Sequence, residues 1–153
     1  MVNIKSLIFN IAIPLAVGGI SSILTRNSME IYASSNQPSF APPGFLFPIV
    51  WTILYILMGI SSYLILRSKS DLKFKAMATY ALQLFVNFIW PLIFFNARMY
   101  LFAFVWLIIL LILVLIMTIL FHKINKIAAY FQIPYILWLI FASILNFNVY
   151  LLN

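Results

Sequence analysis

The chain has 153 residues, of which 66% are hydrophobic and only 7% are charged. About a quarter of the residues in a soluble globular domain are charged, so this composition excludes a water-soluble fold and predicts an integral membrane protein. The net charge of +7 comes from lysines and arginines beside apolar segments, which indicates contact with anionic lipid and argues against nucleic acid as a partner.

Five stretches without charged residues are each long enough for a helix of about 20 residues, the length that crosses about 30 Å of hydrocarbon. A charge at the membrane centre costs about 2.5–3.5 kcal/mol, so we expect an all-α integral membrane bundle of five transmembrane helices, with residues 1–153 in a single domain. The predicted helices cover residues 4–24, 45–66, 76–95, 99–121 and 127–152.

Two of these predicted segments have a distinct composition. Residues 26–43 form the one long loop, and their serines and prolines predict a structured lid over one end of the bundle. The fourth predicted helix, residues 99–121, is almost entirely aliphatic, and we expect it to face lipid. The fifth contains Pro134 and is expected to run to the C-terminus.

The basic residues are distributed unevenly between the two sides of the membrane. Arg26 and Arg98 fall on one side. The side of the N-terminus carries the other seven, namely Lys5, Arg67, Lys69, Lys73, Lys75, Lys123 and Lys126. Because cytoplasmic loops are enriched in lysine and arginine, we expect a cytoplasmic N-terminus and an external C-terminus.

Polar and aromatic residues recur at helical spacing on three of the predicted helices. The three stripes are Trp51 with Tyr55, Gln83 with Asn87 and Trp90, and Tyr135 with Trp138, Ala142 and Asn146. A rise of 1.5 Å per residue places six of them at the midplane or in the outer half of the bundle, namely Trp51, Asn87, Trp90, Trp138, Ala142 and Asn146. This coincidence predicts an apolar ligand cavity beneath the long loop. Two alternatives stay open: tryptophans also form belts at membrane interfaces, and asparagines also hydrogen-bond helices together.

The sequence offers little for acid–base or metal chemistry. Its acidic residues are Glu30 and Asp71, in loops on opposite sides of the membrane, so a pair of carboxylates is excluded. His122 is the single histidine and lies at the inner boundary, where we interpret it as an interfacial residue. The chain has no cysteine, and we expect no metal and no cofactor.

Three blocks of sequence resemble the translocator protein family, also called tryptophan-rich sensory proteins or peripheral benzodiazepine receptors. The blocks are Pro38–Pro43 with Trp51 and Tyr55, Gln83–Asn87 with Trp90 and Phe94–Arg98, and Pro134–Trp138 with Phe141, Ala142 and Asn146. They follow one another in the family's order over nearly the whole chain.

The resemblance implies a homodimeric receptor in a bacterial cell membrane. It implies that the receptor binds porphyrins such as protoporphyrin IX, and isoquinoline or benzodiazepine drugs, under the first loop. By position, the implied ligand-binding residues are Tyr32, Pro42, Trp51, Tyr55, Asn87, Trp90, Trp138, Ala142 and Asn146. An alternative function is an enzyme that degrades porphyrin with light and oxygen, with Trp51 and Trp138 as participants. A further alternative is a transporter of small hydrophobic solutes.

The chain departs from the family pattern at several positions. Gln37 replaces a lysine, Phe40 replaces a tryptophan, and Trp106 replaces an acidic residue. Near the C-terminus, Tyr150 is not followed by the arginine of the sterol-binding relatives. The sterol motif is therefore missing there, and we do not expect a sterol as a partner.

Overall fold

The computed structural model describes the whole chain, from Met1 to Asn153. Its elements are α1 (Ile4–Ala33), α2 (Leu46–Leu66), α3 (Lys73–Pro91), the short π-helix η1 (Leu92–Asn96), α4 (Tyr100–Ile124), α5 (Lys126–Tyr130) and α6 (Ile133–Leu152). The chain contains no strand, and five helical segments are long and apolar enough to cross a membrane. The predicted all-α membrane bundle is confirmed.

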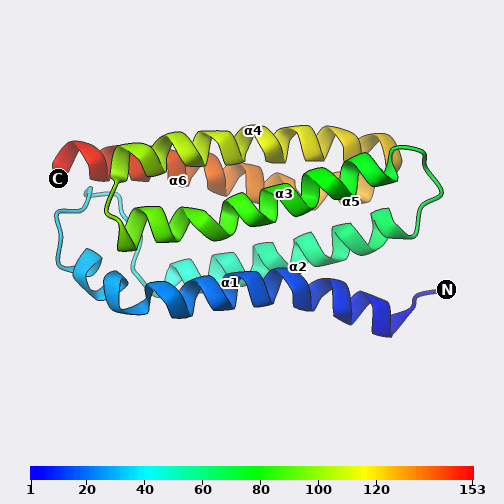
Figure 1. The fold of residues 1–153 in the computed structure, drawn as a ribbon, viewed down its shortest axis with the longest axis horizontal. Helices are drawn as coiled ribbons and strands as arrows, with labels where there is room; N and C mark the ends of the chain where they lie inside the picture. Colours follow the sequence, from blue (N-terminus) through cyan, green and yellow to red (C-terminus); the bar gives the residue numbers. More distant parts are fainter.

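The helices lie side by side along one long axis, with the N-terminus at one end of the bundle and the C-terminus at the other (Figure 1). α1 packs against α2 and α3, and α4 lies against both α3 and α6. The short α5 contacts α4 and α2. By contrast, the backbones of α2 and α6 have few close contacts, so side chains must fill the space between these two helices.

The first helix is longer than expected, because it continues to Ala33 instead of ending near residue 24. Arg26 and Glu30 mark where a membrane span ends, but neither residue breaks a helix. The helix stops at Ser34, whose Oγ donates a hydrogen bond to Ile31 O at 2.8 Å. The predicted loop 26–43 is therefore wrong at its start, and the observed connection runs over residues 34–45.

Proline changes the third and fifth predicted helices. Without an N–H at Pro91, the end of α3 widens into η1, where Ala97 N donates to Leu92 O at 3.0 Å, five residues back. The predicted helix 127–152 corresponds to one membrane span, Lys126–Leu152, but a turn at residues 131–132 divides it into α5 and α6. The division falls just before Pro134, which lies in the first turn of α6, where a missing N–H costs nothing.

The expectation that the fourth helix faces lipid holds for only one of its faces. The other face of α4 is fully buried, through Ala103, Leu107, Leu110, Val114, Met117 and Phe121. These residues recur every three or four positions and form a stripe toward α3 and α6. Lipid tails are as apolar as leucine, so composition alone could not separate the buried face from the lipid face.

Candidate ligand site

An aromatic cluster bridges the space between α2 and α6. Trp51 of α2 stacks on Tyr55, with ring centroids 5.5 Å apart and planes inclined by 29°. The same indole meets two rings of α6 edge to face, Tyr135 at 6.1 Å and Trp138 at 6.5 Å. These separations lie within the range of favourable aromatic contacts. The structure thus brings the three predicted residues Trp51, Tyr55 and Trp138 together.

Two phenylalanines extend the cluster toward the long loop. Phe47 lies 5.8 Å from Trp138, and Phe141 lies 5.3 Å from the same indole. The predicted site did not include either residue. Phe47 is four positions before Trp51 and Phe141 is three positions after Trp138, so helical spacing is the signal that could have identified both.

The loop from residue 34 to residue 45 reaches this cluster and is tied to the C-terminus. Phe40 at its centre lies 6.4 Å from Phe141. Asn153 Nδ2 donates to Asn36 O at 2.8 Å, and Gln37 Nε2 donates to Tyr32 O at 3.2 Å. The loop is therefore held by polar contacts at its start and places an aromatic ring on the end of the cluster.

An apolar groove of about 380 Å³ runs between α2 and α6 beside the cluster. Its lining consists of Val50, Ile53, Leu54, Pro134, Leu137, Trp138 and Phe141. Ile53 and Leu137 are 52% and 61% exposed, so the mouth of the groove opens outward from the bundle. Trp138 also contributes the one unusual polar atom, because its Nε1 is buried and has no hydrogen-bond partner.

A chain of hydrogen bonds supports the cluster from the centre of the bundle. Tyr55 Oη donates to Asn87 Oδ1, Asn87 Nδ2 donates to Tyr135 Oη, and the Tyr135 hydroxyl donates to Gln83 Oε1, each at 2.8 Å. Gly18 of α1 leaves room for Tyr55, since a Cβ at this position would overlap the tyrosine ring. Asn87 thus acts behind the aromatic cluster and does not line the groove.

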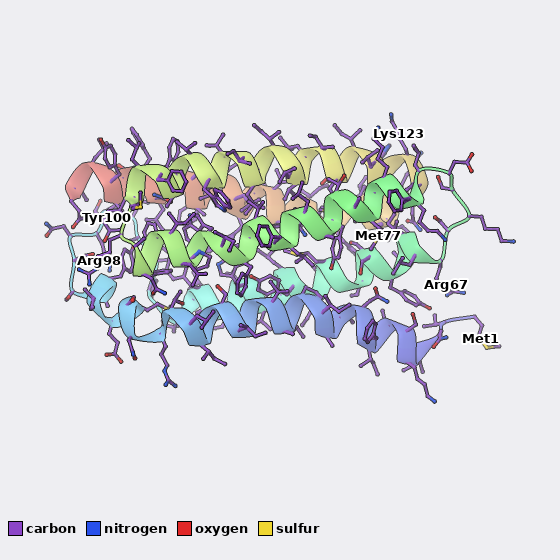
Figure 2. All side chains as sticks on the ribbon, viewed as in Figure 1. Met1, Arg67, Met77, Arg98, Tyr100 and Lys123 are labelled. Carbon is purple, nitrogen blue, oxygen red and sulfur yellow. The ribbon has the colours of Figure 1, made fainter.

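The remaining predicted residues lie elsewhere. Trp90 Nε1 donates to Asn146 Oδ1 at 3.1 Å, and Asn146 Nδ2 donates to Tyr100 O at 2.8 Å. Tyr32 packs on Phe94 with ring centroids 5.3 Å apart. Figure 2 shows Tyr100 at the end of the bundle that also carries Arg98, opposite Met1. Tyr32, Trp90 and Asn146 therefore belong to a second aromatic cluster around η1.

The last two predicted residues contribute less directly to the groove. Ala142 is buried in the main hydrophobic core with Trp138 packed against that core, and Pro42 is half-buried in the loop. Neither lines the groove. Of the nine predicted residues, Trp138 alone does.

Known proteins resemble the chain over nearly its full length. The sequence model of the TspO/MBR family matches residues 10–152. The tryptophan-rich protein TspO of Archaeoglobus fulgidus is 38% identical over 152 residues, which is 99% of each chain. The human translocator protein is 32% identical over 85% of this chain and 79% of its own, and the tryptophan-rich sensory protein of Cereibacter sphaeroides is 30% identical over 81% and 77%. With its five candidate spans and this coverage, the chain belongs to the TspO/MBR family of membrane proteins.

Proposed function

We propose that the protein is a membrane receptor for flat apolar ligands, with porphyrins such as protoporphyrin IX preferred and isoquinoline or benzodiazepine-type drugs as further ligands. The observation that carries this proposal is the groove between α2 and α6, which is lined by the aromatic side chains of Trp138 and Phe141. Its volume of about 380 Å³ falls within the ~300–1,000 Å³ range of small-molecule sites.

The chemistry of the groove matches a flat ligand with a polar edge. Indole and phenyl faces stack on a planar π-system at centroid distances of about 4.5–7 Å. The Trp138 N–H is buried and has no partner, which is costly. A rotation of the indole that turned this N–H toward the groove would let it donate to a carbonyl or carboxylate oxygen of a ligand. The open mouth between Ile53 and Leu137 would let a macrocycle extend beyond the groove and enter from the lipid.

Porphyrin titration of the detergent-solubilised protein tests this proposal. We expect protoporphyrin IX to quench the tryptophan fluorescence of the native chain. We also expect the double variant Trp51→Leu/Trp138→Leu to bind porphyrin about two- to tenfold more weakly. The contact of the Trp138 ring with the ligand, worth about 0.5–1.5 kcal/mol, is lost, and so is the Trp51 ring that packs edge to face on Trp138. Binding of the variant is measured through porphyrin absorbance, which does not depend on the number of tryptophans.

The matched control is Trp106→Phe, because the Trp106 Nε1 donates a hydrogen bond to Val86 O and the side chain lies outside the groove. Native porphyrin affinity in the control, together with weaker porphyrin binding in the double variant, would support the proposal. Equal affinity in all three proteins would refute it. Porphyrin degradation by Trp51 and Trp138, solute transport and the homodimer stay predictions from the family resemblance.

We also propose that the N-terminus is cytoplasmic and the C-terminus external, because the basic residues concentrate at the end of the bundle that carries Met1. Figure 2 shows Arg67 and Lys123 at that end and Arg98 at the opposite one. The chain has no cysteine, so single cysteines can be introduced without a background. In intact cells, an impermeant thiol reagent should label Ser35→Cys and spare Ser70→Cys; the reverse pattern would invert the topology.

A further inference from the structure

A second groove lies at the end of the bundle that carries the N-terminus, far from the aromatic cluster. It has a volume of about 340 Å³ and lies between α4 and the junction of α5 with α6. Leu115, Ile119 and Ile133 form its apolar part, and His122, Lys123 and Tyr130 form its polar rim. The sequence places His122 at the inner membrane boundary and predicts contact of the basic residues with anionic lipid, but it predicts no groove at this position.

The division between α5 and α6 positions this groove. Ala129 of α5 is buried and is part of the groove lining, next to Tyr130 at the helix end. The chain then turns at Phe131 and Gln132 before Ile133 starts α6. One wall therefore comes from α4, and the other comes from the two helices on either side of the turn.

The rim consists of hydrogen-bond donors that the rest of the chain leaves free. The side chains of His122, Lys123 and Tyr130 are exposed and form no hydrogen bond or ion pair within the chain. The rings of His122 and Tyr130 lie 6.1 Å apart. Lys123 adds a positive charge, at the end of the bundle that holds seven of the nine lysines and arginines. Such a rim is complementary to an anion.

The apolar part of the groove continues from the rim toward the membrane centre. Leu115 precedes His122 by seven residues, so the α4 wall extends about 10 Å along the helix axis. That depth is a large part of one leaflet, whose hydrocarbon is about 15 Å thick. A free anion would contact only the polar rim. An uncharged hydrocarbon chain would contact only the apolar wall.

We propose that this groove binds an anionic phospholipid from the leaflet on the side of the N-terminus. Its phosphate would lie among His122, Lys123 and Tyr130, and one acyl chain would lie along Leu115, Ile119 and Ile133. The occupant is a membrane lipid because the combination of charge and apolar depth fits no soluble ion. This site is independent of the ligand receptor function, since it shares no residue with the groove that contains Trp138.

Thermal unfolding of the whole protein in detergent, with added lipid, tests the proposal. Phosphatidylglycerol should raise the melting temperature in a saturable manner, and phosphatidylcholine and inorganic phosphate should raise it far less. Lys123→Gln should weaken the apparent affinity for phosphatidylglycerol about fivefold, the equivalent of one lysine at an anionic surface. Its matched control is Lys126→Gln, a basic residue of the same end that lies outside the groove.

The apolar wall has its own pair of variants. Ile119→Trp should fill the groove and abolish the saturable shift, whereas Ile112→Trp, exposed on the same helix and outside the groove, should retain it. If Lys123→Gln and Lys126→Gln weakened the apparent affinity for phosphatidylglycerol equally, the lipid would bind a diffuse basic surface, and the proposal would be overturned. An equal shift with inorganic phosphate alone, or with phosphatidylcholine, would overturn it as well. Porphyrin binding should be unchanged in all four variants, which separates this test from that of the receptor function.

Discussion

Replacing Asn87 with leucine is expected to lower the free energy of unfolding by about 1–3 kcal/mol. The Asn87 amide accepts from the Tyr55 hydroxyl and donates to the Tyr135 hydroxyl, and all three side chains are buried. Leucine has a similar volume but neither group, so the Tyr55 hydroxyl would lose its only acceptor in an apolar core. The measurement is unfolding in mixed micelles with increasing dodecyl sulfate, followed by circular dichroism.

The control for this variant is Asn148→Leu on α6. Asn148 Nδ2 donates to Ile144 O of its own helix and links no other helix, so its replacement should change the unfolding free energy much less. A second comparison adds Tyr55→Phe to Asn87→Leu. In Asn87→Leu the Tyr55 hydroxyl already lacks an acceptor. Adding Tyr55→Phe should therefore lower the free energy of unfolding little further, or even raise it. Additive losses would contradict the proposed network.

The variant Ile53→Trp is expected to weaken porphyrin binding by about tenfold or more, equivalent to ~1.4 kcal/mol. Ile53 lines the mouth of the groove between α2 and α6 and faces outward. A tryptophan there would occupy the space through which a ligand passes, while leaving the aromatic cluster intact. Affinity and association rate are both measured by stopped-flow mixing with protoporphyrin IX.

The chain offers a close control in Ile49, one helical turn before Ile53 on α2. Both side chains are 52% exposed, but Ile49 does not line the groove. Ile49→Trp should bind porphyrin like the native chain. Equal losses of porphyrin affinity in the two variants would point to a general effect on α2. Native porphyrin affinity in Ile53→Trp would exclude the groove as the ligand site.

Much of the fold could be predicted from the spacing of charged residues. The span of α2 was expected at residues 45–66 and is observed at Leu46–Leu66, because Arg67 both ends the apolar run and follows the helix. The same rule failed at α1, since Arg26 ends the apolar run but not the helix. Charge marks where a segment leaves the hydrocarbon, whereas only capping groups and proline end the backbone hydrogen bonding.

The candidate site could be predicted in part, for a related reason. Helical periodicity placed Trp51, Tyr55, Trp138 and Asn87 on inward faces, and the structure joins them through stacking and hydrogen bonds. Periodicity does not report the rotation of one helix against another or the local spacing between helices. It could not show that Trp90 would bond Asn146 in a separate cluster.

The most direct test is a crystal structure of the protein with protoporphyrin IX bound. Our account predicts the macrocycle in the groove between α2 and α6, stacked against Trp138, with a ligand oxygen about 3 Å from the indole nitrogen. A macrocycle bound instead in the second aromatic cluster around Trp90, with the Trp138 groove empty, would contradict it.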